Sequence, residues 1–132
     1  MTKVLIADDK PAGRELIRIV VESCGYEVVE ASDGIEAIRM ARETNPDLVV
    51  LDLHMPGIDG FGVMRELRAD KMLAAKPVMA LTASAMRGDR DRALEAGFDS
   101  YITKPAQIPE LRAEVRRLIT EGRGGRQHGP YS

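Results

Sequence analysis

Short apolar runs alternate with amphipathic segments along this chain. Three continuous apolar runs occupy residues 4–7, 48–51 and 78–81, and polar residues, Pro or Gly bound each of them. Continuous apolar runs of this length are typical of strands that are buried on both faces of a sheet. Two weaker strands are predicted at residues 26–30 and 100–103. The pattern therefore predicts five strands.

The segments between these runs repeat their apolar residues with helical spacing. The predicted apolar faces of five helices are Leu16, Ile17, Val20, Val21 and Cys24; Ala37, Ile38 and Ala41; Phe61, Met64 and Leu67; Met86, Ala93 and Leu94; and Ile108, Leu111, Val115 and Leu118. Asp33 and Asp59 are expected to cap the second and third helices, because a carboxylate there accepts a free N–H of the first turn. Gly25 and Gly97 are expected to end the first and fourth helices.

A strand followed by a helix is thus repeated five times. Strands that are separated by helices of this length wind most simply, through right-handed crossovers, into one parallel sheet. The predicted fold class is α/β, with a doubly wound five-stranded parallel sheet. Residues 1–120 are expected to form this one domain. Residues 121–132 show no apolar period and are expected to be a disordered tail.

Composition narrows the class of protein without indicating an activity. The 132 residues carry 19 Lys+Arg and 21 Asp+Glu, which gives a formal net charge of -2. This balance and the 4% of aromatic residues argue against a nucleic-acid-binding surface. The single cysteine excludes an internal disulfide and a zinc site built on several thiolates. Neither a membrane-spanning run nor a signal peptide is recognisable, so a cytoplasmic protein without membrane contacts is expected.

Polar residues follow the predicted strands at the ends where parallel sheets bind their ligands. The first strand leads into Asp8 and Asp9, the third into Asp52, the fourth into Thr82 and the fifth into Lys104. Clustered carboxylate oxygens suit Mg²⁺, and a carboxylate can also act as a nucleophile toward phosphorus. A metal ion and a lysine can then supply positive charge to a phosphoryl group in transfer.

Four segments together resemble the receiver domains of response regulators, of the CheY type. They are the pair Asp8-Asp9, LDLHMPGIDG at residues 51–60, ALTA at residues 80–83 and YITKP at residues 101–105. The resemblance extends from about residue 3 to residue 119. It implies a flavodoxin-like strand order of 2-1-3-4-5. The segment at residues 83–105 is similar to hybrid-kinase receivers and to single-domain regulators of the DivK type.

The resemblance implies a phosphoacceptor and a metal site. Asp52 would accept the phosphoryl group. Asp9, supported by Asp8, would hold Mg²⁺ together with Asp52 and the backbone carbonyl of His54, and Mn²⁺ could substitute for Mg²⁺. Lys10 departs from the family pattern, where Glu or Asn is frequent, and places a cation beside this site.

The resemblance also implies a conformational switch. Thr82 would turn its hydroxyl onto the phosphoryl group, and Lys104 would pair with another phosphoryl oxygen. The peptide bond between Lys104 and Pro105 would be cis. Tyr101 matches the aromatic switch position, and phosphorylation would favour the state in which Thr82 and Tyr101 are turned inward. His54 and Ser84 stand where relatives tune the lifetime of the phosphate.

The implied function is a phosphoacceptor module of a two-component system or phosphorelay. A histidine kinase or a histidine phosphotransfer protein would donate the phosphoryl group. The fourth helix, fifth strand and fifth helix would then contact a downstream protein. Catalysis would be limited to the module's own phosphorylation and dephosphorylation, with no output domain in this chain. The expected oligomeric state is a monomer or a weak dimer that depends on phosphorylation.

Other interpretations stay open on the sequence alone. Asp8 and Asp9 could cap the first helix, Lys104 could be a solvated lysine, and Tyr101 could be a half-buried strand residue. An aspartyl-nucleophile phosphatase of the haloacid dehalogenase type would want an acid where His54 stands. A flavodoxin-like cofactor binder would want a phosphate cradle where the two acids follow the first strand. A receiver that only scaffolds would not need the full set of strand-end residues.

Overall fold

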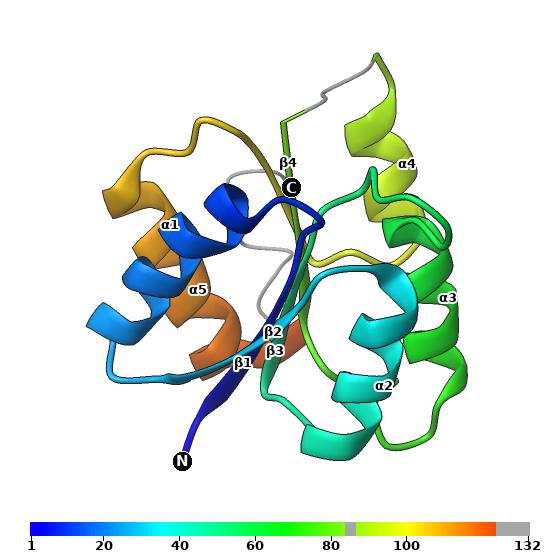
Figure 1. Cartoon of the computed structure of the whole chain (residues 1–132), viewed down its shortest axis with the longest axis horizontal. Coiled ribbons are helices and arrows are strands. Elements are labelled where there is room, and N and C mark those ends of the chain that lie inside the picture. Colours follow the sequence, from blue (N-terminus) through cyan, green and yellow to red (C-terminus); the bar gives the residue numbers. More distant parts are fainter. Residues whose placement is uncertain (84–86, 124–132) are drawn as a thin grey trace.

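The computed structural model describes residues 1–83 and 87–123 (Figure 1). Five strands alternate with five helices: β1 Lys3–Ala7, α1 Pro11–Ser23, β2 Glu27–Ala31, α2 Gly34–Thr44, β3 Leu48–Leu51, α3 Gly60–Ala69, β4 Val78–Thr82, α4 Asp89–Glu95, β5 Ser100–Thr103 and α5 Ile108–Glu121. All neighbouring strands are parallel and follow the order β2-β1-β3-β4-β5. The predicted α/β class and the implied strand order are confirmed.

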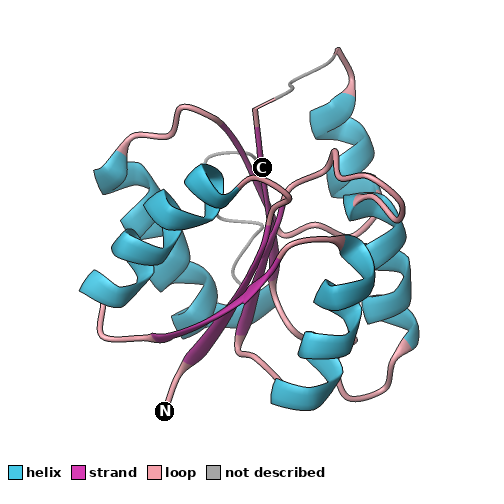
Figure 2. Cartoon of the chain, viewed as in Figure 1, coloured by secondary structure: helices cyan, strands magenta, loops and turns pink. Residues whose placement is uncertain are grey.

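Helices cover both faces of the sheet (Figure 2). Helices α1 and α5 lie on one face, whereas α2, α3 and α4 lie on the other (Figure 1). Alternate residues of a strand point to opposite faces, so Val4 and Ile6 of β1 join the core under α1 and α5. Leu5 and Ala7 join the core under the other three helices. This two-sided burial explains why the central strands read as continuous apolar runs.

The predicted helix caps are confirmed. The Asp33 carboxylate accepts the N–H of Glu36 at 2.8 Å, and the Asp59 carboxylate accepts the N–H of Gly62 at 2.9 Å. Neither acid after β1 is the N-cap residue of α1, which is Lys10 and forms no cap hydrogen bond with its side chain. Asp8 instead accepts the N–H of Lys10 itself at 2.9 Å.

Two predicted apolar faces are narrower than expected. Leu16 of α1 is 41% exposed and Ile108 of α5 is 45% exposed. Each lies at the margin of its helix's buried face, whose centre is formed by residues such as Ile17 and Leu111. Met86, expected on the fourth helix, lies outside the described residues.

The end of α5 is fastened to the sheet at the amino end of β4. The helix runs through Glu121, and the Arg123 guanidinium pairs with Asp99 at 2.9 Å. Asp99 also pairs with Arg68 at 3.1 Å and accepts the N–H of Val78 at 2.8 Å. Residues 121–123 of the expected tail are described in the structure, whereas residues 124–132 lie outside the described part. No described helix has the length and apolar character needed to cross a membrane.

Candidate functional site

The carboxyl ends of the central strands bring three carboxylates together. Strands β1 and β3 are paired in register at Ala7 and Leu51, and the Asp52 N–H donates to the Ala7 carbonyl at 3.0 Å. Asp52 and the residues that follow Ala7 consequently lie side by side. Each of Asp8, Asp9 and Asp52 offers a carboxylate oxygen, and these oxygens all lie within 4.8 Å of one another. The convergence expected from topology is confirmed.

The donor set of this cluster fits a divalent cation. Asp8 and Asp52 are 4% and 8% exposed. Within residues 1–83 and 87–123, Asp9 Oδ1 is a buried oxygen that has no hydrogen-bond partner. A buried carboxylate oxygen is costly to leave unpaired, and three clustered negative charges repel one another. Hard oxygen ligands in this arrangement suit Mg²⁺, so Asp8, Asp9 and Asp52 could hold that ion.

Lys104 reaches the cluster from the loop after β5. Its ammonium Nζ lies 2.5 Å from Asp8 Oδ2, and its backbone N–H donates to the Thr82 carbonyl at 2.8 Å. The Lys104–Pro105 peptide bond is cis, as the resemblance implied. Lys10 has an exposed side chain and contributes its backbone N–H, which donates to Asp8 Oδ1 at 2.9 Å. The ammonium that meets the acids in this structure is therefore that of Lys104.

Burial raises the pKa of the Asp52 carboxyl above its usual value. The negative charge of Asp8 raises this pKa further, whereas the N–H of His54, the charge of Lys104 and a hydrogen bond from Thr82 lower it. The raising effects prevail, because removal of a charged group from water is only partly offset by these partners. The folded protein therefore disfavours the ionised form of Asp52 relative to water.

Because the ionised Asp52 carboxylate is unfavourable, we expect Asp52→Asn to stabilise the protein near neutral pH when no metal is bound. A carboxyl whose pKa is raised on folding weakens the folded state once the pH rises through that pKa. Relief of like-charge repulsion between carboxylate oxygens that lie within 4.8 Å of one another should increase the unfolding free energy by about 1 kcal/mol. The gain should shrink as the pH falls toward the ordinary carboxyl value of 3.8. Urea unfolding with a chelator across this pH range tests it, and a variant less stable at neutral pH would contradict it.

The two expected switch residues are both buried. Thr82 is fully buried at the end of β4, and Tyr101 on the neighbouring strand β5 is 6% exposed. Burial raises the pKa of the Tyr101 phenol, as does the charge of Asp89, although a hydrogen bond with Thr103 lowers it. Both side chains are therefore turned into the protein in this structure. Ser84, the second expected lifetime residue, lies outside the described residues.

An interaction that the sequence did not reveal connects the Asp52 loop to α4. The His54 N–H donates to Asp52 Oδ1 at 3.1 Å, and His54 Nε2 lies 3.2 Å from Asp89 Oδ2. Asp89 is the first residue of α4 and is 2% exposed. In the sequence, Asp89 belongs to a run of alternating charges at residues 87–92, and such a run is typical of a solvated helix face. No local pattern pairs residues this far apart in the chain.

Two glycines allow the loop after Asp52 to pack tightly on the flanking helices. A Cβ on Gly60 would lie 2.6 Å from the Asp52 carbonyl oxygen. A Cβ on Gly34, at the start of α2, would lie 2.2 Å from the Ile58 carbonyl oxygen. Both distances are far below van der Waals contact, so only glycine, which has no side chain, fits at these two positions. These contacts hold the segment that carries His54 beside the cluster.

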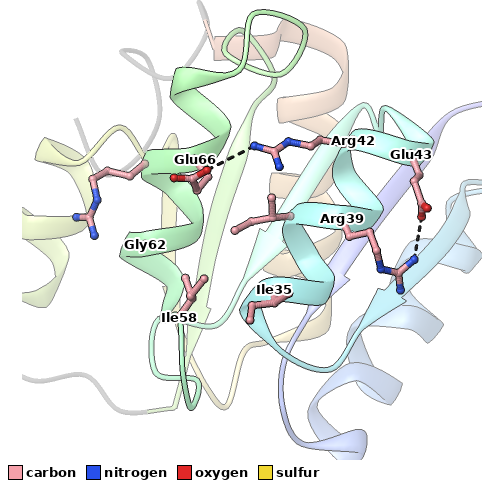
Figure 3. A pocket seen from close by; sticks show the side chains of 9 residues that line it. Ile35, Arg39, Arg42, Glu43, Ile58, Gly62 and Glu66 are labelled. Carbon is pink, nitrogen blue, oxygen red and sulfur yellow. Dashed lines mark hydrogen bonds and ion pairs between the residues drawn. The ribbon is translucent and has the colours of Figure 1, made fainter.

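A hollow of about 550 Å³ lies between α2 and α3, away from this chemistry. Figure 3 shows Ile35 and Ile58 facing this hollow, with Arg42 of α2 reaching across it to Glu66 of α3. That ion pair measures 3.4 Å. None of the strand-end residues lines the hollow, so its size does not make it the functional site.

Comparisons with known proteins agree with this geometry. The response regulator receiver domain family matches residues 4–116. The polar-differentiation response regulator DivK of Brucella ovis is 40% identical over 120 residues, which are 90% of this chain and 98% of DivK. The DNA-binding dual master transcriptional regulator RpaA of Synechocystis is 42% identical over 119 residues, which are 90% of this chain. The chain spans only 49% of RpaA's length.

A solved structure adds a metal-bound relative. The receiver domain of sensor histidine kinase PA1611 from Pseudomonas aeruginosa has a magnesium ion coordinated in its active-site cleft. It is 35% identical to this chain, with a TM-score of 0.83, and the match covers 91% of this chain and 98% of that one. The extent of the family match and the clustered strand-end residues lead to the same conclusion. This chain belongs to the response-regulator receiver domains of two-component signalling systems.

Proposed function

We propose that the protein accepts a phosphoryl group on Asp52 from a histidine of a partner protein. The observation that carries this proposal is the carboxylate cluster. Within the described part of the chain, Asp9 Oδ1 is buried there without a hydrogen-bond partner, and burial raises the pKa of the neighbouring Asp52 carboxyl. Lys104 adds a positive charge at the same rim. A dication would neutralise the negative charges of such a cluster, and one of its carboxylates could then attack a phosphoryl group.

In the proposed transfer, an Asp52 carboxylate oxygen attacks the phosphorus atom. The phosphorus–nitrogen bond to the partner's histidine breaks, its electron pair returns to the imidazole, and an aspartyl phosphate forms. Asp8, Asp9 and Asp52, with the backbone carbonyl of His54, would hold Mg²⁺, which supplies positive charge to the phosphoryl oxygens. Mn²⁺ has the same preference for oxygen ligands and would substitute.

Two side chains of this protein would then form new contacts with the phosphoryl group. Lys104, which meets Asp8 Oδ2 in this structure, would exchange that partner for a phosphoryl oxygen. Thr82 already donates a hydrogen bond to Asp52 and would donate it to a phosphoryl oxygen instead. Both groups face the carboxylates in this structure. Positive charge and a donor that are placed in advance lower the cost of the transfer.

The proposed output is a change in the surface formed by α4, β5 and α5. Thr82 and Tyr101 are both buried. The phosphoryl group would shift the population toward this inward arrangement by holding Thr82. Through its contact with Asp89, His54 would couple phosphorylation of Asp52 to the position of α4. The hydrogen bond between the His54 N–H and Asp52 also supports a role of His54 in the lifetime of the phosphate. Ser84 is proposed for the same lifetime role. The contact partner would be a downstream protein.

A donor protein would dock beside α1. Leu16 and Ile19 of α1 are 41% and 55% exposed. Leu16, Lys104 and Pro105 line part of a hollow of about 220 Å³. An apolar surface that adjoins the phosphoacceptor rim suits a histidine kinase or a histidine phosphotransfer protein. Because such donors obtain their phosphoryl group from ATP, we place the reaction in the cytoplasm.

We propose no activity on other substrates beyond phosphorylation and dephosphorylation of this chain. A haloacid-dehalogenase-like phosphatase is less well supported, because His54 stands where such an enzyme needs an acid and its ring contacts Asp89.

The decisive experiment is labelling with a small phosphodonor. Incubation of the wild-type protein with acetyl phosphate and Mg²⁺ should add one phosphoryl group per chain, measured by intact-protein mass spectrometry. Peptide mapping should locate it on the segment that contains Asp52, and a chelator should prevent it. Labelling that persists with the chelator, or that maps to another segment, would refute the proposed site.

A further inference from the structure

The first turn of α1 contains a glycine whose missing side chain leaves room for the carboxylate cluster. Gly13 is the third residue of α1, and its N–H donates to the Lys10 carbonyl at 3.1 Å. A Cβ on Gly13 would lie 2.3 Å from Asp8 Oδ2 and 3.0 Å from Lys104 Nζ. Non-bonded heavy atoms normally lie about 3.5–4.0 Å apart. Any other residue at this position would therefore force Asp8 to move.

Asp8 has little freedom to make that movement. Its side chain is almost completely buried, and both of its carboxylate oxygens are engaged. Oδ1 accepts the Lys10 N–H at 2.9 Å, and Oδ2 meets the Lys104 ammonium at 2.5 Å. Its backbone carbonyl accepts Arg14 Nη1 at 2.7 Å, which fixes the main chain as well. A displaced carboxylate would lose at least one of these bonds and leave its place beside Asp9 and Asp52.

The helix itself gives no reason for glycine at this position. Glycine stabilises a helix less than alanine does, because it loses more backbone freedom on folding. Gly13 has an ordinary helical backbone and is absent from the positions with positive φ. Its neighbour Ala12 is exposed. The space beside Asp8 is thus the feature that requires Gly13.

We propose that Gly13 is a positioning residue for the carboxylate cluster. Its bare backbone lets the Asp8 carboxylate lie against the first turn of α1, where Lys104 and the Lys10 N–H hold it. The position of Asp8 in turn sets the affinity of the cluster for Mg²⁺. This last step rests on the proposed function, whereas the placement of Asp8 is a property of the metal-free protein.

The test uses Gly13→Ala with Ala12→Gly as its matched control. Gly13→Ala should weaken Mg²⁺ binding about tenfold, as measured by titration calorimetry, because it moves a group that orients a ligand. In the metal-free protein, the Lys10 amide should lose hydrogen-exchange protection, since its acceptor on Asp8 has moved. Ala12→Gly changes the helix at an exposed position and should leave both quantities at their wild-type values.

A double-mutant cycle separates this role from a general effect on the helix. If Gly13 acts through Asp8, adding Gly13→Ala to Asp8→Ala should change the Mg²⁺ affinity less than about twofold. Equal weakening in both backgrounds, or wild-type affinity and Lys10 protection in Gly13→Ala, would overturn the proposal. If the wild type bound no Mg²⁺, the proposed metal site would fail, and the exchange of the Lys10 amide would still decide the role of Gly13.

Discussion

Replacing Asp52 with asparagine should abolish phosphorylation of this protein by acetyl phosphate in the presence of Mg²⁺. The asparagine side chain has nearly the same shape, and its oxygen can still accept the His54 N–H that reaches Asp52 Oδ1 at 3.1 Å. It lacks the anionic oxygen that attacks phosphorus, so the aspartyl phosphate cannot form. We expect labelling to fall by at least about 100-fold, a loss typical of a removed essential catalytic group.

The matched control for this prediction is Asp59→Asn on the same loop. Asp59 caps α3 through the Gly62 N–H, and asparagine is an equally good capping residue. The substitution removes one negative charge near the site without altering the carboxylate cluster. Labelling should therefore stay at the wild-type level. Equal labelling of Asp52→Asn and the wild type would exclude Asp52 as the phosphoacceptor.

The largest expected effect on stability follows the substitution Arg68→Met. The Arg68 guanidinium donates to the carbonyls of Ala74, Lys76 and Gly97 at 3.2, 2.9 and 2.8 Å and pairs with the buried Asp99. Methionine would remove the Arg68 donor from all three carbonyls, of which that of Ala74 would keep Arg123 Nη1 at 3.4 Å. The buried charge of Asp99 would lose one of its two arginine partners. Removing one partner of a buried ion pair typically costs about 3–5 kcal/mol. We expect a loss of about 3 kcal/mol, because Arg123 still pairs with Asp99.

Arg65→Met is the matched control on the same helix. Arg65 is exposed and forms no ion pair with any residue in the described part of α3 or its surroundings. Its replacement should change the unfolding free energy by less than about 0.5 kcal/mol. Urea unfolding of both variants measures the difference. A loss below about 1 kcal/mol for Arg68→Met would contradict the view that this cluster holds the amino end of β4.

The fold was predictable because the sheet is buried on both faces. Central strands such as β3 then consist only of apolar residues, and helices between them leave parallel pairing as the simplest arrangement. The convergence of Asp8, Asp9 and Asp52 followed from the same topology, since parallel strands end at one edge. Asp33 and Asp59 were readable as caps because capping is a local interaction.

The remaining features depend on contacts between distant segments. The ion pair of Lys104 with Asp8, the contact of His54 with Asp89, and the close approach of Gly13 each join elements that are separate in the chain. Residue type alone cannot reveal such a contact, because lysine, aspartate and glycine are most often solvated or serve as turn residues. The same limit explains Leu16, whose exposure depends on what packs against the edge of its helix.

The burial of Tyr101 has a consequence for spectroscopy. The chain contains 0 Trp and 3 Tyr, so no indole absorbs the emission of the phenol rings. Tyr26→Phe and Tyr131→Phe would leave the Tyr101 ring, packed among the core residues on the α4 side of the sheet, as the single tyrosine emitter. Quenching of that emission by iodide would then follow the ring's access to water in solution. The protein thus contains its own optical probe, at the position where we propose that its two states differ.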